Sequence, residues 1–141
     1  MVVPPDTKVD SEYFQTALEN HMQPWADHKH AGRYSMVMDN APSHRSKSTA
    51  GWFNRNWPAG GSRHVLYHPP ASPDLNPLDY TCWSTWARKV PDCSTLAELR
   101  AKVIGAGMDL AQDPDIGHRA IAGEFRRRLA ACIAAKGDLF E

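Results

Sequence analysis

Cysteine is scarce in this chain of 141 residues, and net charge and long apolar runs are absent. The three cysteines, at positions 82, 93 and 132, form no C-x-x-C pair, which argues against a zinc site and favours buried thiols in a reducing compartment. No apolar run approaches the roughly 20 residues that a membrane span needs, so we expect no membrane partner. A complete DNA-binding protein usually carries an excess of basic residues, and the zero net charge of this chain gives no such sign. Any nucleic-acid role must therefore come from a local patch or from another part of a larger protein.

What remains is the composition of an ordinary globular domain. Apolar residues make up 42% and charged residues 23%, which excludes a disordered chain. The length fits one domain over residues 1–141 with a real core. The opening stretch MVVPPDTKVD has no basic segment followed by an apolar core, so we expect no secretory signal and an intracellular protein.

Two short apolar segments bounded by loops, residues 34–39 and 63–68, predict buried strands. Helical patterns surround them, so the order of elements is that of an α/β fold. The expected helices begin after Asp10, cover residues 46–56 with Trp52 and Phe53 facing inward, begin at Asn76, begin at Thr95, and cover residues 117–136. Two strands alone make a marginal sheet. Either a further strand lies within residues 1–9, or the chain lacks a sheet partner.

Prolines and glycines mark the expected ends of these helices. Pro24 should end the first helix or follow it directly, and residues 27–33 read as a polar loop. Gly137 is a good stop for the last helix. Apolar residues recur at four-residue spacing along that last helix and predict its buried face: Ile121, Phe125, Leu129 and Ile133.

Two aspartates stand at well-defined junctions of these elements. Asp39 follows the first predicted strand, at the carboxyl end where ligands of α/β sheets gather. Asp79 lies on the first turn of the helix that Asn76 caps. Two such carboxylates could hold Mg²⁺ or Mn²⁺. Simpler alternatives stay open, because Asp39 could only form a turn and Asp79 could only favour a helix N-terminus.

The segments around these aspartates, MDNAPSH and HPPASPDLNPLDYTCW, resemble the catalytic core of Tc1/mariner-type transposases. In that superfamily the second catalytic Asp lies in an Asp-Asn-Ala turn, and a Ser-Pro-Asp-Leu-Asn-Pro loop precedes the third acidic residue. The matching positions are Asp39 and Asp79, with 39 residues between them and Asp in the third place. The resemblance extends over nearly the whole chain and is specific because both motifs occur in order.

The resemblance implies a ribonuclease-H-like fold and a metal-dependent DNA endonuclease and strand transferase. Asp39 and Asp79 would be catalytic metal ligands for Mg²⁺ or Mn²⁺, supported by Asn40, His44 and Asn76. The partner would be transposon-end DNA, with a possible homodimer, in the nucleus of a eukaryotic source. Arg126, Arg127 and Arg128 on the last helix would contact DNA phosphates in this family-style interpretation, whereas a solvated face is the simpler one.

The chain also departs from the family's pattern. The family needs three carboxylates, and the first of them in chain order lies on an opening strand. Here the only acid before the cap of the first helix is Asp6, in a turn-like PPDTK stretch. We therefore expect the C-terminal part of a catalytic domain, with the opening strands missing from the fold and little strand-transfer activity in the chain alone. The alternative is a decayed or domesticated remnant that acts as a DNA-binding or protein-interaction module. Asp74 lies nearer to Asp39 in sequence, but the motif match favours Asp79 as the ligand.

Overall fold

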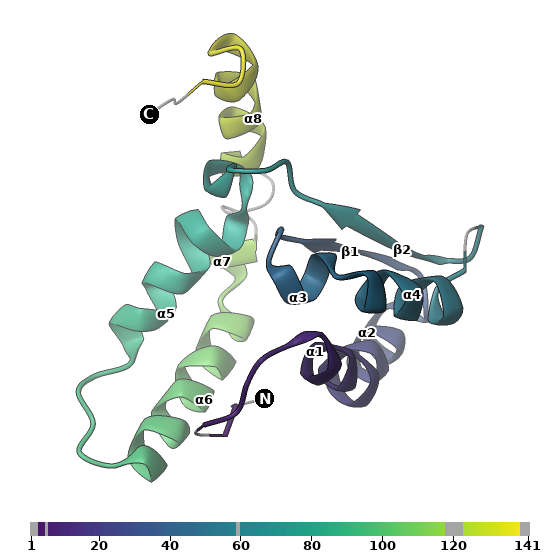
Figure 1. Cartoon of the computed structure of the whole chain (residues 1–141). Coiled ribbons are helices and arrows are strands. Elements are labelled where there is room, and N and C mark those ends of the chain that lie inside the picture. The colour runs from purple at the N-terminus through teal and green to yellow at the C-terminus, as the bar shows by residue number, and fades with distance from the viewer. Residues whose placement is uncertain (1–2, 5, 59, 118–122, 139–141) are drawn as a thin grey trace. The chain divides into compact units, whose positions relative to one another are not determined.

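The computed structural model describes residues 3–4, 6–58, 60–117 and 123–138. They fall into two compact units, Met1–Pro70 and Ala71–Glu141, and each is described here by itself (Figure 1). The expectation of a single domain over residues 1–141 stays a prediction.

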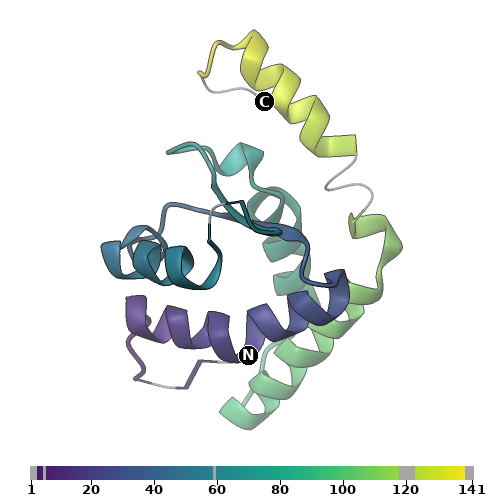
Figure 2. The ribbon, with the colours of Figure 1, turned by 90° about the vertical axis from the view of Figure 1, so that its right-hand side faces the viewer.

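The first unit opens with a long helix in three parts. These are α1 (Ser11–Ala17), a π-helical turn (Leu18–Met22) and α2 (Gln23–His30). Figure 2 shows them as one continuous coil. Asp10 caps this helix as predicted, because its carboxylate accepts hydrogen bonds from the amides of Glu12 and Tyr13, each at 3.1 Å.

The prediction that Pro24 ends this helix was wrong. The amide of Gln23 donates to the carbonyl of Leu18, five residues back, so the helix widens by one π turn directly before the proline. This widening relieves the clash that a proline ring makes with the preceding turn of an α-helix. The helix therefore continues to His30, through much of the 27–33 segment that reads as a loop.

The two predicted strands are present and pair in parallel. β1 (Tyr34–Met38) lies beside β2 (Arg63–Tyr67), in a register that runs from Tyr34↔Arg63 to Met38↔Tyr67. Helices connect the strands, which makes a βαβ unit and confirms the α/β order. One face of the pair packs on the helices of the unit (Figure 1).

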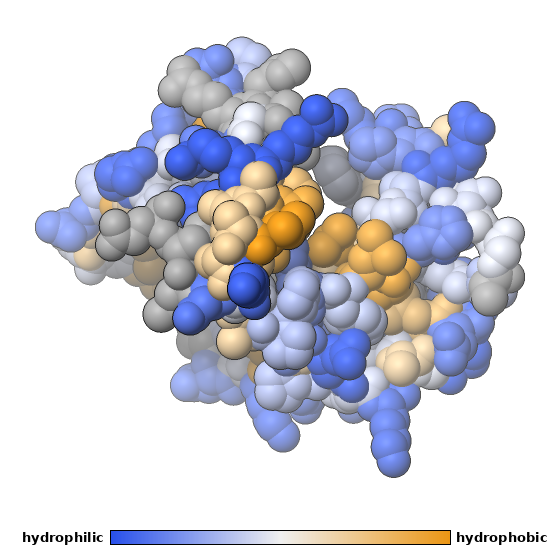
Figure 3. All heavy atoms as spheres, turned by 90° about the horizontal axis from the view of Figure 1, so that it is seen from above, coloured by the Kyte–Doolittle hydropathy of each residue, from blue (hydrophilic) through white to orange (hydrophobic). Residues whose placement is uncertain are grey.

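No described element of this unit covers the opposite face of the strand pair. Val37 and Leu66 are neighbours in the register and are 52% and 53% exposed. Figure 3 shows apolar side chains gathered over the strands on the side seen from above. Two exposed strand edges and an apolar face are what a partner strand or helix would cover in a larger sheet.

The chain between the strands supplies most of the core. It forms two helices, α3 (Pro42–Arg45) and α4 (Lys47–Asn56). Trp52 and Phe53 are buried as predicted. The core cluster brings the long helix, β1 and α4 together through Leu18, Met38, Trp52, Phe53 and Trp57.

The second unit consists of short turns and helices. Its elements are a 3₁₀ turn (Pro73–Leu75), a π-helical turn (Leu78–Cys82), α5 (Trp83–Lys89), α6 (Leu96–Gln112), α7 (Pro114–Gly117) and α8 (Phe125–Ala134). The predicted starts at Asn76 and Thr95 are confirmed. The Glu98 carboxylate accepts a hydrogen bond from the amide of Ser94, one residue before the cap, which is a variant of the capping box.

The last helix, predicted over residues 117–136, is described only in part. The structure confirms it where it describes α8, within that range, whereas residues 118–122, with Ile121 among them, lie outside the described residues. Leu129 and Ile133 are 39% and 70% exposed, so their stripe is not buried in this unit. Gly137 has φ of +85° and its amide donates to the carbonyl of Cys132, which confirms the stop.

Two absences hold for the described part of the chain. β1 and β2 are its only strands, so the described positions within residues 1–9 add none to the sheet. No helix among the described ranges combines the length and apolar character that crossing a membrane requires.

The ion pair between α2 and β2 makes a testable prediction about pH. Arg63 Nε and Nη2 donate to the two carboxylate oxygens of Asp27 at 2.8 and 2.9 Å, and these bonds hold the pKa of Asp27 below its ordinary value. The resulting stability is complete above the unfolded pKa of about 4 and is lost as pH falls through the lowered folded pKa. We expect Asp27→Asn to lower the free energy of unfolding by about 1 kcal/mol at pH 7. Urea unfolding at pH 7 and pH 3 checks this, and an equal loss at both pH values would contradict it.

Candidate metal centre

Asp39 follows β1 directly, and its carboxylate is held by one oxygen. Oδ1 accepts the backbone amide of Ala41 at 3.0 Å, which closes the turn expected from the sequence. The same oxygen lies 2.6 Å from Nδ1 of His44. Because an ionised carboxylate only accepts, Nδ1 of His44 is the donor. For Oδ2, the described residues supply no hydrogen bond.

The protein keeps this carboxylate ionised. The Ala41 amide, more than the His44 hydrogen bond, holds the pKa of Asp39 below its ordinary value, although partial burial opposes the shift. The Asp39 side chain is 56% exposed, so solvent and ligands reach it. An ionised, accessible carboxylate with one oxygen unbonded is suited to a hard cation.

Neighbouring elements fix His44 in its place. The ring of Phe14 from α1 packs against the His44 ring with centroids 4.2 Å apart and the two planes tilted by 39°. The hydroxyl of Tyr67, at the end of β2, donates to the His44 carbonyl at 3.3 Å. His44 therefore orients Asp39 as a residue that is itself packed between a helix and a strand.

Asn40 ties the ends of the two strands together. Its Nδ2 donates to the carbonyl of His68, the residue after β2, at 2.8 Å. The amide of His68 in turn donates to the carbonyl of Met38 at 2.8 Å. Asn40 thus fixes the strand end that carries Asp39, and its supporting role at a metal site stays a prediction.

Asp79 is also held by one oxygen, here by a side-chain amide. Nδ2 of Asn76 donates to Asp79 Oδ2 at 2.8 Å, and Asn76 Oδ1 accepts the amide of Leu78 at 3.2 Å. The buried Asn76 therefore caps the helix and orients the aspartate at the same time. Oδ1 of Asp79 has no hydrogen bond from the described residues, and the side chain is exposed.

The three arginines of α8 differ in their surroundings. Arg126 is exposed, and Arg127 is 68% exposed and donates to Glu124 at 2.8 Å. Arg128 is only 25% exposed and faces Asp74 and the ring of Tyr80. Contact with DNA phosphates stays a prediction for Arg126 and Arg127, whereas the Arg128 guanidinium is already engaged within its unit.

The structure assembles two sets of site residues. Asp39, Asn40 and His44 meet in the first unit, and Asn76 meets Asp79 in the second. Their convergence stays a prediction, because no group of three or more His, Cys, Asp or Glu side chains able to hold a metal occurs among the described residues. The contacts of Phe14 and Tyr67 with His44 were not predicted, because local sequence does not show which distant ring meets His44.

Comparison with known proteins gives a family match and relatives of known type. A family model described as "DDE superfamily endonuclease" matches residues 2–100. The Tcb2 transposase of Caenorhabditis briggsae is 38% identical over 94% of this chain and 46% of its own length. The Tcb1 transposase of the same species is 33% identical over 92% of this chain and 45% of its own length. The chain thus spans about half the length of these relatives.

Solved structures of the Mos1 mariner transposase share the fold. The paired-end complex with Mn superposes with a TM-score of 0.80 at 24% identity, over the whole of this chain and 40% of that one. The catalytic domain with raltegravir and Mg gives 0.75 at 24% identity, over the whole of this chain and 70% of that one. This confirms the predicted ribonuclease-H-like fold, of which this chain covers a part.

The double role of Asn76 makes a testable prediction. Asn76→Ala removes both the cap acceptor and the donor to Asp79, and we expect it to lower the free energy of unfolding by about 1 kcal/mol. Asn76→Ser keeps a cap acceptor and should restore at least half of that loss. Urea unfolding of both variants measures the difference, and equal losses would show that Asn76 does not act as a cap.

Proposed function

The chain belongs to the DDE superfamily endonucleases, of the Tc1/mariner transposase type, and on this premise we propose that Asp39 and Asp79 are two carboxylate ligands of a divalent-metal site that cleaves and joins DNA at transposon ends. The activity would belong to the intact protein, of which this chain supplies part of the catalytic domain.

One observation carries the proposal. Each aspartate has one oxygen fixed by a neighbouring donor and the other left without a hydrogen bond from the described residues. A carboxylate that only closed a turn would need no second donor, but Asp39 Oδ1 also accepts a hydrogen bond from His44 Nδ1. Asp79 accepts one hydrogen bond, from the side-chain amide of the residue that caps its helix, Asn76. Partners of this kind orient metal ligands in general.

The donor set fits magnesium or manganese. Both ions take oxygen ligands, and Mg²⁺ commonly binds through one or two carboxylates and retains several waters. The Mos1 mariner transposase has been solved as a paired-end complex with Mn and as a catalytic domain with Mg. A bound metal would supply an activated water and stabilise the leaving oxygen at phosphate.

This chain's own residues prepare the site. Asp39 stays ionised through the Ala41 amide, and His44 holds the carboxylate in one orientation. Asn76 orients Asp79 at the start of its helix. Since Asn40 fixes the strand end beneath Asp39, the ligands are pre-organised and little ordering remains on binding.

DNA is the proposed substrate and partner. A solved relative at 22% identity is described as a Mos1 paired-end complex with the left transposon end. We extend DNA binding, a homodimer and a nuclear location in a eukaryotic source to the intact protein as parts of the same proposal. Within this chain, Arg126 and Arg127 of α8 are exposed to solvent and are the proposed phosphate contacts, and Arg127 would exchange its ion pair with Glu124 for one with phosphate.

The proposal predicts metal binding that depends on both aspartates. Calorimetric titration of the full chain with Mn²⁺ should show one site, and Asp39→Asn and Asp79→Asn should each weaken it by at least about tenfold. Asp109→Asn, an exposed aspartate on α6, serves as the matched control and should bind as the wild type does. If the wild type binds no Mn²⁺, or if only one aspartate matters, the shared site is wrong.

His44 gives a second prediction for the same site. His44→Ala removes the donor to Asp39 Oδ1, and we expect Mn²⁺ affinity to fall by about tenfold, the usual effect of removing an orienting partner. His28→Ala, in the last turn of α2, is the control. Unchanged affinity in His44→Ala would limit His44 to a packing role against Phe14.

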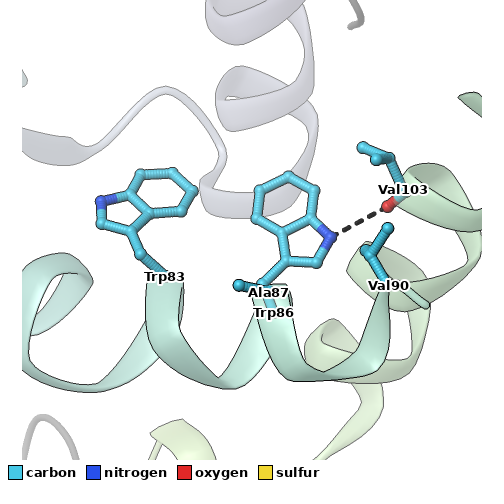
Figure 4. Close-up of a pocket in the computed structure, with 5 residues that line it drawn as sticks. All are labelled: Trp83, Trp86, Ala87, Val90 and Val103. Atoms are coloured by element: carbon cyan, nitrogen blue, oxygen red, sulfur yellow. Dashed lines mark hydrogen bonds between the residues drawn. The ribbon is translucent and has the colours of Figure 1, made fainter. Parts of the chain in front are cut away.

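A protein-interaction module is the second candidate function. The second unit has an open apolar groove of about 460 Å³, lined by Trp83, Trp86, Ala87, Val90 and Val103. Figure 4 shows the two indoles side by side, with Trp86 Nε1 bonded to the Val103 carbonyl at 3.0 Å. This groove contains none of the proposed ligands. Absence of Mn²⁺ binding in the titration above would favour this candidate.

A further inference from the structure

Arg128 makes contacts that its neighbours on α8 do not. Its guanidinium Nη1 lies 3.5 Å from the carbonyl oxygen of Asp74 and 3.9 Å from Asp74 Oδ1. On its other side the guanidinium carbon lies 4.3 Å from the centre of the Tyr80 ring. Its Nε lies 3.7 Å from Glu124 Oε2, on the same helix.

These contacts lie on both sides of the site's acidic junction. Asp74 belongs to the 3₁₀ turn that comes before Asn76, and Tyr80 is the residue directly after Asp79. One side chain from α8 therefore spans the loop and the first turn of the helix. The Asn76–Asp79 hydrogen bond lies between its two points of contact along the chain.

The chemistry of arginine suits this bridge. A guanidinium is planar and always charged, so it can stack on an aromatic face while its edge approaches oxygens. The Nε atom is buried and has no hydrogen-bond partner in the described structure, so burial of this side chain carries a cost. A solvated arginine on a DNA-facing surface would avoid that cost by pointing outward, as the exposed Arg126 does.

We propose that Arg128 is a positioning residue for Asp79: it clamps the Pro73–Leu75 turn against Tyr80 and so fixes the geometry in which Asn76 orients the aspartate. The consequence for metal binding rests on the proposed function above. The clamp itself does not, because it concerns the Asn76–Asp79 hydrogen bond.

The first test reads that hydrogen bond directly. In NMR spectra of the full chain, the Asn76 side-chain amide should exchange with solvent about tenfold faster in Arg128→Met than in the wild type. Arg126→Met, two residues away on the same helix, is the matched control and should leave that signal unchanged. Equal effects in the two variants, or no effect in either, would overturn the clamp.

A second variant keeps the test decisive if Arg128→Met fails to fold. Tyr80→Leu removes the aromatic face but keeps the arginine. It should also make the Asn76 side-chain amide exchange faster with solvent than in the wild type. Arg128→Lys keeps the charge and loses the planar group, so it should restore only part of the wild-type protection. Full protection in both Tyr80→Leu and Arg128→Lys would contradict the proposal.

The third readout connects the clamp to the site. Mn²⁺ affinity should fall about fivefold in Arg128→Met and stay unchanged in Arg126→Met, with thermal unfolding followed in parallel. If the wild type binds no Mn²⁺, the proposed function fails while the amide exchange still decides the clamp. If Mn²⁺ binds normally in Arg128→Met although the amide exchanges faster, the clamp does not position Asp79 for metal and the inference is overturned.

Discussion

The parallel pairing of β1 with β2 is the constraint on which the proposed site depends. Parallel strands bring their carboxyl ends to one edge, so Asp39 and the start of the loop toward Asp79 leave the sheet together. The hydrogen bond from Asn40 to the His68 carbonyl then fixes that edge. A slip of one residue would turn Met38 out of the core and move every residue of the junction.

A strand pair of this size is marginal alone, so the helices stabilise it. The long helix reaches the sheet through Leu18, and α4 contributes Trp52 and Phe53. The ion pair of Asp27 with Arg63 adds a polar tie between α2 and β2. The described helices of this unit cover one face, and Val37 and Leu66 on the other face are about half exposed.

Asp39 and Asp79 are both held through one carboxylate oxygen, although the donors differ. Asp39 is oriented by a backbone amide and a histidine, and Asp79 by an asparagine that also caps its helix. In both aspartates one carboxylate oxygen accepts hydrogen bonds from the protein, and the other accepts none from the described residues. This arrangement explains why the simpler roles and the metal role are compatible: closing a turn or starting a helix is how the chain fixes the carboxylate.

Local sequence was sufficient where the signal is local. Caps at Asp10, Asn76 and Thr95, the two strands, and the inward positions of α4 follow from spacing and residue type. The effect of Pro24 on the first helix was predicted wrongly. The clash of its ring with the preceding turn is relieved by a π turn, which has no clear sequence signal.

The surroundings of the arginines show the same limit in the candidate site. Arg126 and Arg128 look alike in sequence, but only the structure shows that one meets Asp74 and Tyr80, because that contact joins residues 54 positions apart. Asp39 and Asp79 were singled out by the motif resemblance, and their hydrogen-bond partners His44 and Asn76 lie within five positions in the sequence. The contacts of Phe14 and Tyr67 with His44 depend on tertiary packing and have no local signal.

Paramagnetic broadening by Mn²⁺ tests the central claim most directly. Mn²⁺ added below one equivalent to the full chain broadens the amide signals of residues near it. If one metal site joins the two junctions, the amides of Asn40 and Ala41 should broaden in parallel with those of Leu78 and Tyr80, at the same Mn²⁺ concentrations. Broadening confined to one junction, or at clearly different concentrations for the two, would contradict a shared site.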